Sequence, residues 1–279
     1  MNLEAYAKIN LGLHIVGKRP DGFHNIETIF HHIALHDKIT LLLNSNIEIS
    51  SSNPSIPVNK DNLCWKAVDL LRRELSLTYG AAIHIKKNIP IGAGLGGGSS
   101  DAAAVLQHLP SLWNVDVADE VLQRLALQLG SDVPFFLKKS SAYAEGRGEI
   151  LSYFPFRLPY WIVVVNPNIH VSTPWAYSAL AEQRHGTFPQ RSKLLKNISE
   201  FRLEDILHND FEEVVFKQHP SIKEVKNNFL KLGAVHALMS GSGSSVFGLF
   251  ENESTALKAA EFFDKKNFVH MTKPDFSIE

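Results

Sequence analysis

The feature that most constrains the fold of this chain is a glycine-rich stretch, PIGAGLGGGSSDAAA, at residues 90–104. Residues 83–85 alternate like a strand just before it, and the residues from Asp101 onward favour a helix. Glycines let backbone N–H groups approach a ligand closely, and a helix N-terminus adds partial positive charge. Ser99 and Ser100 are the predicted N-cap residues of that helix. The stretch therefore predicts a strand–loop–helix unit that binds phosphate.

Two common phosphate loops do not describe this stretch. A Walker A loop needs Lys after its last Gly, but here the glycines run into Ser-Ser-Asp. The dinucleotide-binding pattern G-x-G-x-x-G is met by Gly92, Gly94 and Gly97. However, the second parallel strand ending in an acidic residue is missing, because a helix is predicted at residues 118–129. A flexible glycine linker is the other alternative, and the flanking strand and helix argue against it.

Composition limits the class of protein. The chain has 279 residues, of which 44% are hydrophobic and 20% charged, as in ordinary globular proteins. The length favours two domains, predicted at residues 1–155 and 156–279. A net charge of −1 argues against nucleic-acid or membrane-surface binding. The single Cys64, the absence of a secretion-signal pattern and the short apolar runs predict a cytoplasmic protein.

Two polar residues near the N-terminus share one face of a predicted strand. Residues 3–15 alternate, with apolar side chains on one face and Lys8 and Asn10 on the other. This pattern predicts a strand with one buried side. Lys8 is then either a solvated lysine on a half-exposed strand or a functional amine.

A carboxylate lies in an unusual apolar setting at residues 130–136, GSDVPFF. The predicted helix before it stops at Gly130. Asp132 either caps a following turn, which is a common use of Asp, or has a catalytic role. Earlier in the chain, Asp61 is the predicted N-cap of a helix at residues 62–75, and a helix is predicted at residues 100–109.

Three motifs in this order resemble the kinase superfamily that includes galactokinase, homoserine kinase, mevalonate kinase and phosphomevalonate kinase, the GHMP kinases. They are AKINL at residues 7–11, the glycine-rich stretch, and MSGSGSSV at residues 239–246. The segments AKINLGLHIVGKRPDGFHNIETIF, LGSDVPFFL and AYAEGRGEIL narrow the resemblance to the branch that acts on a cytidylyl substrate. The resemblance extends from about residue 5 to residue 250.

This resemblance implies a fold and a reaction. The implied fold is α+β, with the two-domain GHMP kinase architecture: an N-terminal domain of a kind also found in ribosomal proteins, a ferredoxin-like C-terminal domain, and an active site in the cleft between them. The implied reaction is ATP-dependent phosphorylation of the 2-hydroxyl of 4-diphosphocytidyl-2-C-methyl-D-erythritol, in the methylerythritol phosphate route to isoprenoid precursors. ATP and this alcohol are the expected small-molecule partners. A monomer or a weak homodimer is expected.

The resemblance also implies roles for particular residues. The implied catalytic residues are Lys8 and Asp132. The implied substrate-binding residues are Asn10, Phe23, His24, Thr173, Tyr177 and Gly241. The implied ATP-binding residues are Pro90, Ile91, Gly92, Ala93, Gly94, Leu95, Gly96, Gly97, Gly98, Ser99, Ser100, Asn62, Leu63 and Lys87. Phe23 stands where the family has Tyr, a change that removes a hydroxyl but keeps the ring.

These roles fit the chemistry of phosphoryl transfer, which needs positioning and charge stabilisation. Asp132 would orient the acceptor hydroxyl and take its proton, and Lys8 would stabilise the developing negative charge. A magnesium ion is expected near Ser100 or Asp101. His24 and Tyr177 would hold the two faces of the cytosine.

Three alternative functions remain at this point. The first is another kinase of the superfamily, such as a homoserine or mevalonate kinase. The second is a nucleotide sensor without catalysis, and the third is a nucleic-acid-binding protein. The presence of Lys8, Asp132 and the Pro-Asp-Gly-Phe-His segment, with the near-neutral charge, argues against them.

Overall fold

The computed structural model describes residues 1–188 and 203–278, which form two compact units built from interleaved segments. Unit 1 consists of Met1–Ala7, Leu35–Ile91 and Gly96–Lys139. Unit 2 consists of Lys8–Ala34, Gly92–Leu95 and the described part of Ser140–Glu279. Both units combine helices with sheet, and the predicted α+β class is confirmed. The predicted division at residues 1–155 and 156–279 stays a prediction.

Two long strands, β1 (Asn2–Lys18) and β2 (His24–Asn44), pair with each other and contribute residues to both units. The other elements of unit 1 are β3 (Ile47–Ser51), α1 (Leu63–Glu74), β4 (Gly80–Lys86), α2 (Gly97–Trp113), α3 (Asp119–Leu129) and the 3₁₀ helix η1 (Val133–Leu137). β4 pairs antiparallel with the end of β2, with Leu41 opposite Ile83, and parallel with β3. Of these strands, β4 ends at Lys86, shortly before the glycine-rich stretch begins at residue 90.

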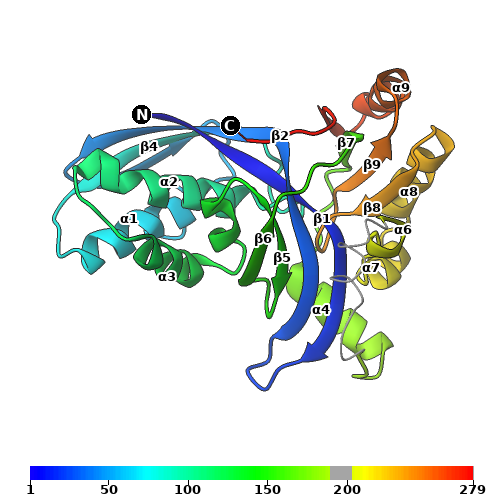
Figure 1. Ribbon diagram of the computed structural model, residues 1–279, viewed down its shortest axis with the longest axis horizontal. Coiled ribbons are helices and arrows are strands. Elements are labelled where there is room, and N and C mark those ends of the chain that lie inside the picture. Colours follow the sequence, from blue (N-terminus) through cyan, green and yellow to red (C-terminus); the bar gives the residue numbers. More distant parts are fainter. Residues whose placement is uncertain (189–202, 279) are drawn as a thin grey trace. The chain divides into compact units, whose positions relative to one another are not determined.

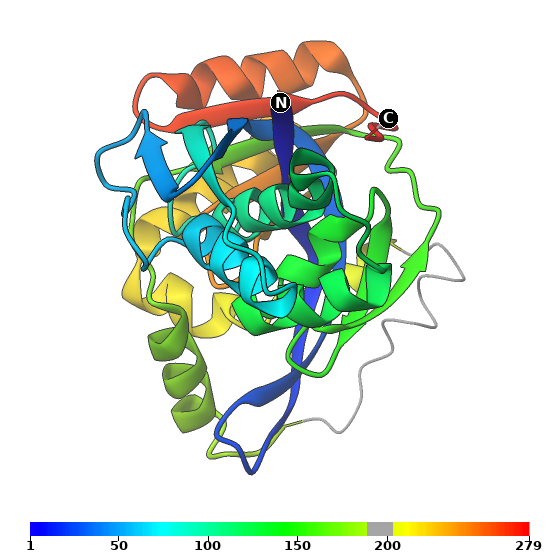
Figure 2. The same ribbon diagram turned by 90° about the vertical axis from the view of Figure 1, so that its left-hand side faces the viewer.

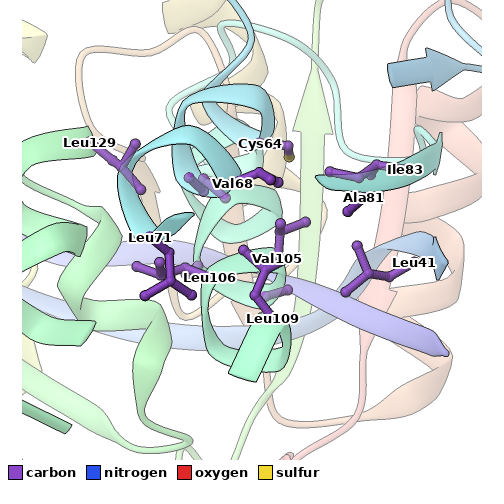
Figure 3. Packing of buried hydrophobic residues seen from close by; sticks show 14 of the residues in the cluster. Leu41, Cys64, Val68, Leu71, Ala81, Ile83, Val105, Leu106, Leu109 and Leu129 are labelled. Atoms are coloured by element: carbon purple, nitrogen blue, oxygen red, sulfur yellow. The ribbon is translucent and has the colours of Figure 1, made fainter. Parts of the chain in front are cut away.

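The core of unit 1 lies between this sheet and its helices. α1, α2 and α3 contact one another (Figure 1). Apolar side chains from the helices meet those of the strands, as Figure 3 shows for Val68, Val105 and Ile83. This packing holds α2, whose N-terminus follows the glycine-rich loop, in a defined position on the sheet of unit 1.

Unit 2 contains the remaining elements. They are β5 (Ser141–Glu145), β6 (Ile150–Phe154), β7 (Trp161–Asn166), α4 (Thr173–Gln183), α6 (Leu203–Ile206), α7 (Glu212–Gln218), α8 (Pro220–Lys231), β8 (His236–Met239), β9 (Val246–Phe250), α9 (Glu253–Asp264) and β10 (Phe268–Thr272). The antiparallel order β10-β7-β9-β8 forms one sheet, and β5 and β6 extend the first half of β2. α9 lies along β10, as Figure 2 shows, and α8 packs on β8 and β9. Residues of β8 and β9 flank the late glycine motif.

The structure corrects three local predictions. α2 begins at Gly97 with Gly96 as its N-cap, so Ser99 and Ser100 lie inside the helix. α2 also continues through Pro110 to Trp113, because buried Trp113 donates its indole N–H to the Gly80 carbonyl at 3.0 Å. The N-cap of α1 is Asn62 instead of Asp61, since the Asn62 side chain accepts the Cys64 N–H at 2.8 Å.

The prediction that β1 buries one face is wrong over its middle part. Both faces are buried from Ala7 to Leu13, and Lys8 is only 4% exposed. The alternation of apolar and polar residues predicted the direction of each side chain. It did not predict that the polar face would also be covered. The interpretation of Lys8 as a solvated lysine is therefore excluded.

None of the helices in the described residues has the length and apolar character required to cross a membrane.

Candidate active site

The glycine-rich loop turns sharply between β4 and α2. Gly92, Gly94 and Gly96 all have positive φ angles, of 62°, 77° and 72°. Such angles are strained for residues with a Cβ atom, so glycine is required for this path. The loop ends directly at Gly97, the first residue of α2. The first N–H groups of this helix have no intrahelical partner and can bind an anion.

Several predicted ATP-binding residues of unit 1 gather at this helix start. The Leu63 side chain lies 4.0 Å from the place where a Cβ on Gly98 would be. A Cβ on Gly97 would come within 2.9 Å of both the Lys87 ammonium and an Ile89 methyl, so these side chains would have to shift. Asn62 is buried, donates to the Pro57 carbonyl and caps α1. The nucleotide roles of these residues stay predictions.

Lys87 belongs to a buried group of three charges in unit 1. Its ammonium contacts Asp37 and, at 2.7 Å, Asp101. Burial opposes the charge of Lys87, but the two carboxylates outweigh it and raise the Lys87 pKa. Burial raises the pKa of Asp101, against the opposing effect of Lys87. This cluster joins β2, the end of β4 and the first turns of α2.

The two predicted magnesium ligands differ in their fit to a cation. The Ser100 hydroxyl donates to the Tyr6 carbonyl at 2.7 Å, which leaves its oxygen lone pairs available. Asp101 binds Lys87 through Oδ2, and its buried Oδ1 has no hydrogen-bond partner among the described residues. Because the Lys87 ammonium would repel a second cation, Ser100 fits magnesium better than Asp101 does.

Asp132 lies between the end of α3 and the start of η1, in unit 1. It occupies the N-cap position of η1, but its side chain makes no capping hydrogen bond. The next residue, Val133, is buried in the core of unit 1 and fixes the backbone here. The capping role that the sequence left open for Asp132 is therefore excluded.

A polar network in unit 2 surrounds Lys8. The Lys8 ammonium donates to Asn10 Oδ1 at 2.6 Å and lies 4.9 Å from the centre of the Phe30 ring. Asn10 in turn donates through Nδ2 to Thr28 Oγ1 at 2.7 Å and through its backbone N–H to Ser240 Oγ at 3.2 Å. Sequence reasoning missed Thr28 and Ser240. The Ser-Gly-Ser-Gly motif was a signal for Ser240, whereas nothing in the sequence singled out Thr28.

The loop and the late glycine motif pack against each other within unit 2. Ser240 Oγ donates to the Gly94 carbonyl at 3.0 Å, and the Lys8 N–H donates to the Leu95 carbonyl at 3.0 Å. A Cβ on Gly94 would come within 2.1 Å of the Ser240 carbonyl oxygen. Gly241 has φ 59°, and a Cβ there would lie 3.3 Å from Gly94. Glycine at both positions therefore permits the contact that brings Lys8, Asn10 and the loop together.

The two residues predicted to hold a base stack directly on each other. The rings of His24 and Tyr177 are nearly parallel, at 16°, with their centroids 4.9 Å apart. Burial, with a smaller effect of Lys18, lowers the His24 pKa and favours the neutral ring. His24 Nε2 is buried without a hydrogen-bond partner among the described residues. This atom is suited to a polar group of a ligand.

Two other predicted substrate-binding residues, Thr173 and Phe23, make contacts of different kinds. Thr173 begins α4, one turn before Tyr177, and its hydroxyl is 2.7 Å from that of Ser242, next to Gly241. Phe23 is 53% exposed and packs under the Arg147 guanidinium at 4.8 Å. Within unit 2, Thr173 therefore contacts the late glycine motif, whereas the Phe23 ring contacts Arg147.

The chain matches two family models over parts of its length and curated relatives over its whole length. Residues 62–140 match the model of the GHMP kinases N terminal domain, and residues 189–270 match that of the GHMP kinases C terminal. A 4-diphosphocytidyl-2-C-methyl-D-erythritol kinase of Chlorobium phaeobacteroides (strain BS1) is 43% identical, over 100% of this chain and 99% of the relative. The enzyme of that name from Prosthecochloris aestuarii (strain DSM 271 / SK 413) is 41% identical, over 100% of this chain and 99% of the relative.

Comparison with solved structures also gives kinases. The crystal structure of a 4-(cytidine 5'-diphospho)-2C-methyl-D-erythritol kinase has a TM-score of 0.83 and 35% identity, covering 99% of this chain and 100% of that one. Homoserine kinase from Cytophaga hutchinsonii, at 15% identity and a TM-score of 0.72 over 99% of this chain and 97% of its own, shares the fold. The chain therefore belongs to the GHMP kinase family and, within it, to the 4-diphosphocytidyl-2-C-methyl-D-erythritol kinases.

Proposed function

We propose that this small-molecule kinase transfers the γ-phosphoryl group of ATP to the 2-hydroxyl of 4-diphosphocytidyl-2-C-methyl-D-erythritol. The observation that carries the choice of substrate is the His24–Tyr177 stack. These residues lie 153 positions apart in the chain, and the resemblance implies a role at the base for both. Homoserine and mevalonate carry no base, so their recognition gives no reason for such a pair.

Binding of the base requires the two rings to separate. A base in contact with a ring on each face needs two contact spacings, about 7 Å between the rings. The observed centroid separation is 4.9 Å. We infer that the cytosine enters by displacing one ring from the other and that the buried His24 Nε2 gains a partner from the base.

Lys8 and Asp132 are the proposed catalytic residues. The 2-hydroxyl oxygen forms a bond to the γ-phosphorus, the bond from that phosphorus to the bridging oxygen of ADP breaks, and the hydroxyl proton passes to Asp132. An alcohol is a very weak acid, so Asp132 mainly orients the hydroxyl and takes the proton as the new bond forms. Lys8 stabilises the negative charge on the transferring group. The N–H groups at the start of α2 bind the ATP phosphates.

Magnesium belongs to this proposal as the ion that accompanies ATP. Ser100 is the residue of this chain proposed to hold it, because its hydroxyl oxygen keeps lone pairs while it donates to Tyr6. When bound, the ion neutralises charge on the phosphates. We further propose a cytoplasmic monomer or weak homodimer, acting in isoprenoid precursor synthesis; the buried Cys64 thiol is compatible with a reducing compartment.

ADP release with a panel of acceptor alcohols tests this function. The wild-type chain is incubated with ATP, magnesium and either 4-diphosphocytidyl-2-C-methyl-D-erythritol, its uridine analogue, homoserine or mevalonate. We expect rapid ADP release with the cytidylyl substrate, reduced kcat/KM with the uridine analogue and background rates with the other two. If the chain binds ATP but releases no ADP with all four acceptors, it is a nucleotide sensor. Preference for homoserine or mevalonate would contradict the substrate proposed.

A further inference from the structure

A short segment that precedes α7 lies against β1 near Asn10. The Leu13 N–H donates to the His208 carbonyl at 2.8 Å, and the Asp210 N–H donates to the Leu13 carbonyl at 3.0 Å. The Asp210 carboxylate also accepts the Ile15 N–H at 2.7 Å. These bonds form a parallel bridge that fixes residues 208–210 to the strand that carries Lys8.

The residue in the middle of this segment, Asn209, points toward the late glycine motif. Its amide Nδ2 donates to the carbonyls of Met239, at 2.7 Å, and Gly241, at 2.8 Å. Its Oδ1 accepts the Phe211 N–H at 3.0 Å. The side chain is 1% exposed, and these three partners determine which amide atom is nitrogen. Asn209 therefore binds the backbone on both sides of Ser240.

Ser240 is the point at which this motif touches the groups around Lys8. Its hydroxyl accepts the Asn10 N–H, and Asn10 Oδ1 accepts the Lys8 ammonium. The Ser240 hydroxyl also donates to Gly94 of the loop. A shift of residues 239–241 would thus move a hydroxyl that contacts both Asn10 and the loop.

We propose that Asn209 is a positioning residue for phosphoryl transfer: it fixes residues 239–241, so that Ser240 orients Asn10 and, through Asn10, the Lys8 ammonium. This inference rests on the proposed function for the assignment of Lys8. Asn209 is 1% exposed and its amide atoms bond to backbone groups, so it acts through the backbone of the glycine motif.

The surroundings of Asn209 allow its side chain to be removed without loss of the segment. Asp210 is held by Arg184 and His208, each at 3.0 Å, in addition to the Ile15 N–H. Burial opposes its charge, but these hydrogen bonds outweigh it and lower the Asp210 pKa well below its usual range. The bridge to β1 should therefore remain when the Asn209 amide is lost.

The test combines enzyme kinetics with hydrogen exchange on the full chain. The variants are Asn209→Ala and Asn209→Asp; in the second, a carboxylate faces two carbonyl oxygens. The matched control is Thr272→Val, because Thr272 is buried in the same unit and its hydroxyl accepts the Ala34 N–H at 3.1 Å. All proteins are assayed for kcat and both KM values, and the exchange of individual backbone amides is followed by NMR.

For Asn209→Ala we expect kcat to fall about 10- to 100-fold, because small displacements of a catalytic group have effects of this size. Both KM values should stay within threefold. The Asn10 amide, which donates to Ser240, should exchange at least tenfold faster, while the Leu13 amide, which donates to His208, should not change. Asn209→Asp should lose more activity than Asn209→Ala. Thr272→Val should change neither kcat nor Asn10 exchange.

A second comparison tests the path through Ser240. In a Ser240→Ala background, Asn209→Ala should lower kcat less than threefold further, since its effect passes through the missing hydroxyl. The inference would be overturned if the effects of Asn209→Ala and Ser240→Ala on kcat were fully additive. It would also be overturned by a wild-type kcat in Asn209→Ala or by an equal loss of kcat in Thr272→Val. Absence of ADP release by the wild type would refute the proposed function instead. Unchanged Asn10 exchange in Asn209→Ala would overturn the inference even then.

Discussion

Each unit of the molecule contains a buried lysine in a different setting. In unit 1, the Lys87 ammonium contacts two buried carboxylates, Asp37 and Asp101. In unit 2, the contacts described for the Lys8 ammonium are an amide oxygen of Asn10 and the face of the Phe30 ring. Both side chains belong to the predicted site, yet the groups described around the two ammonium charges differ in kind.

From this difference we predict which lysine matters more for stability and which for turnover. Two carboxylates compensate the charge of Lys87, and removing the ammonium would leave them buried side by side. The two groups described at the Lys8 ammonium, an amide oxygen and an aromatic ring, stay neutral when the ammonium is removed. Loss of Lys87 should therefore act on stability, and loss of Lys8 on turnover.

The largest expected effect is that of Lys87→Met on folding. Breaking a buried ion cluster by removing one partner destabilises proteins by about 3–5 kcal/mol. The free energy of unfolding in urea should fall by about this amount, while exposed Lys86→Met should change little. Adding Asp101→Asn to Lys87→Met should recover part of the loss. A decrease below about 1 kcal/mol in Lys87→Met would remove the structural role given to this lysine.

Lys8→Met should have the opposite profile. We expect kcat to fall about 100- to 1,000-fold, the range for loss of one group that stabilises a developing charge. The urea midpoint should stay close to that of the wild type. Steady-state kinetics and urea unfolding of the same preparation check this prediction. If Lys8→Met is unfolded without ligand but active when ligand stabilises it, Lys8 serves stability and the comparison is reversed.

Asp132→Asn sharpens the comparison within unit 1. The substitution keeps the shape of the side chain but removes the proton acceptor, so kcat should fall by about two orders of magnitude or more. ATP binding, measured by calorimetry, should be almost unchanged. Because Asn has nearly the same size and shape as Asp, the free energy of unfolding should change by less than about 1 kcal/mol. Turnover close to wild type would exclude Asp132 from catalysis.

His24→Ala and Tyr177→Ala test the base site of unit 2 with a smaller effect. Each should remove about 1–3 kcal/mol of stacking energy and raise KM for the cytidylyl substrate about 5- to 150-fold. KM for ATP should be unaffected. Phe262→Ala is a matched aromatic control, because its exposed ring lies on α9, in the same unit and outside the predicted site. Equal loss of affinity for both ligands would show that the base lies elsewhere.

The smallest effect concerns pH and a buried histidine of unit 2. Burial, with a minor effect of His32, lowers the His31 pKa from 6.5 to about 3. The folded state therefore holds His31 neutral, and its contribution to stability is complete above pH 6.5 and lost as pH falls toward 3. Stability should decline by about 1 kcal/mol per pH unit in this range from this group. Melting at pH 7, 6 and 5 should show a shallower decline in His31→Gln than in the wild type and in exposed His84→Gln.

Much of this site could be predicted from local sequence. The strand, glycine loop and helix around residues 83–109 follow from short-range signals, and the ends of α3 lie within a residue of those predicted. The resemblance also paired His24 with Tyr177. The start of α2 was predicted three residues late, because Ser99 and Ser100 are good N-caps and Gly96 takes that position through a positive φ angle.

Contacts between distant residues could not be predicted in this way. Nothing in the alternation of β1 indicates that Ser240, 230 residues away from Asn10, covers its polar face. Likewise, Lys87 is predicted near ATP, but no sequence signal indicates that it would form buried ion pairs with two carboxylates. Asn209 has no motif around it that predicts a bond to Met239 and Gly241.

The sequence alone determined the glycine-rich loop, the family and the residue types available for the reaction, because backbone angles, helix signals and motifs depend on neighbouring residues. The tertiary structure decided which polar groups are buried and which partners they have. Residues 8–34 and 92–95 join the C-terminal segment in unit 2, and this grouping brings Ser240 against Asn10 and Gly94. Burial depends on the packing of segments far apart in the chain, so the environment of Lys8 exists only in the folded protein.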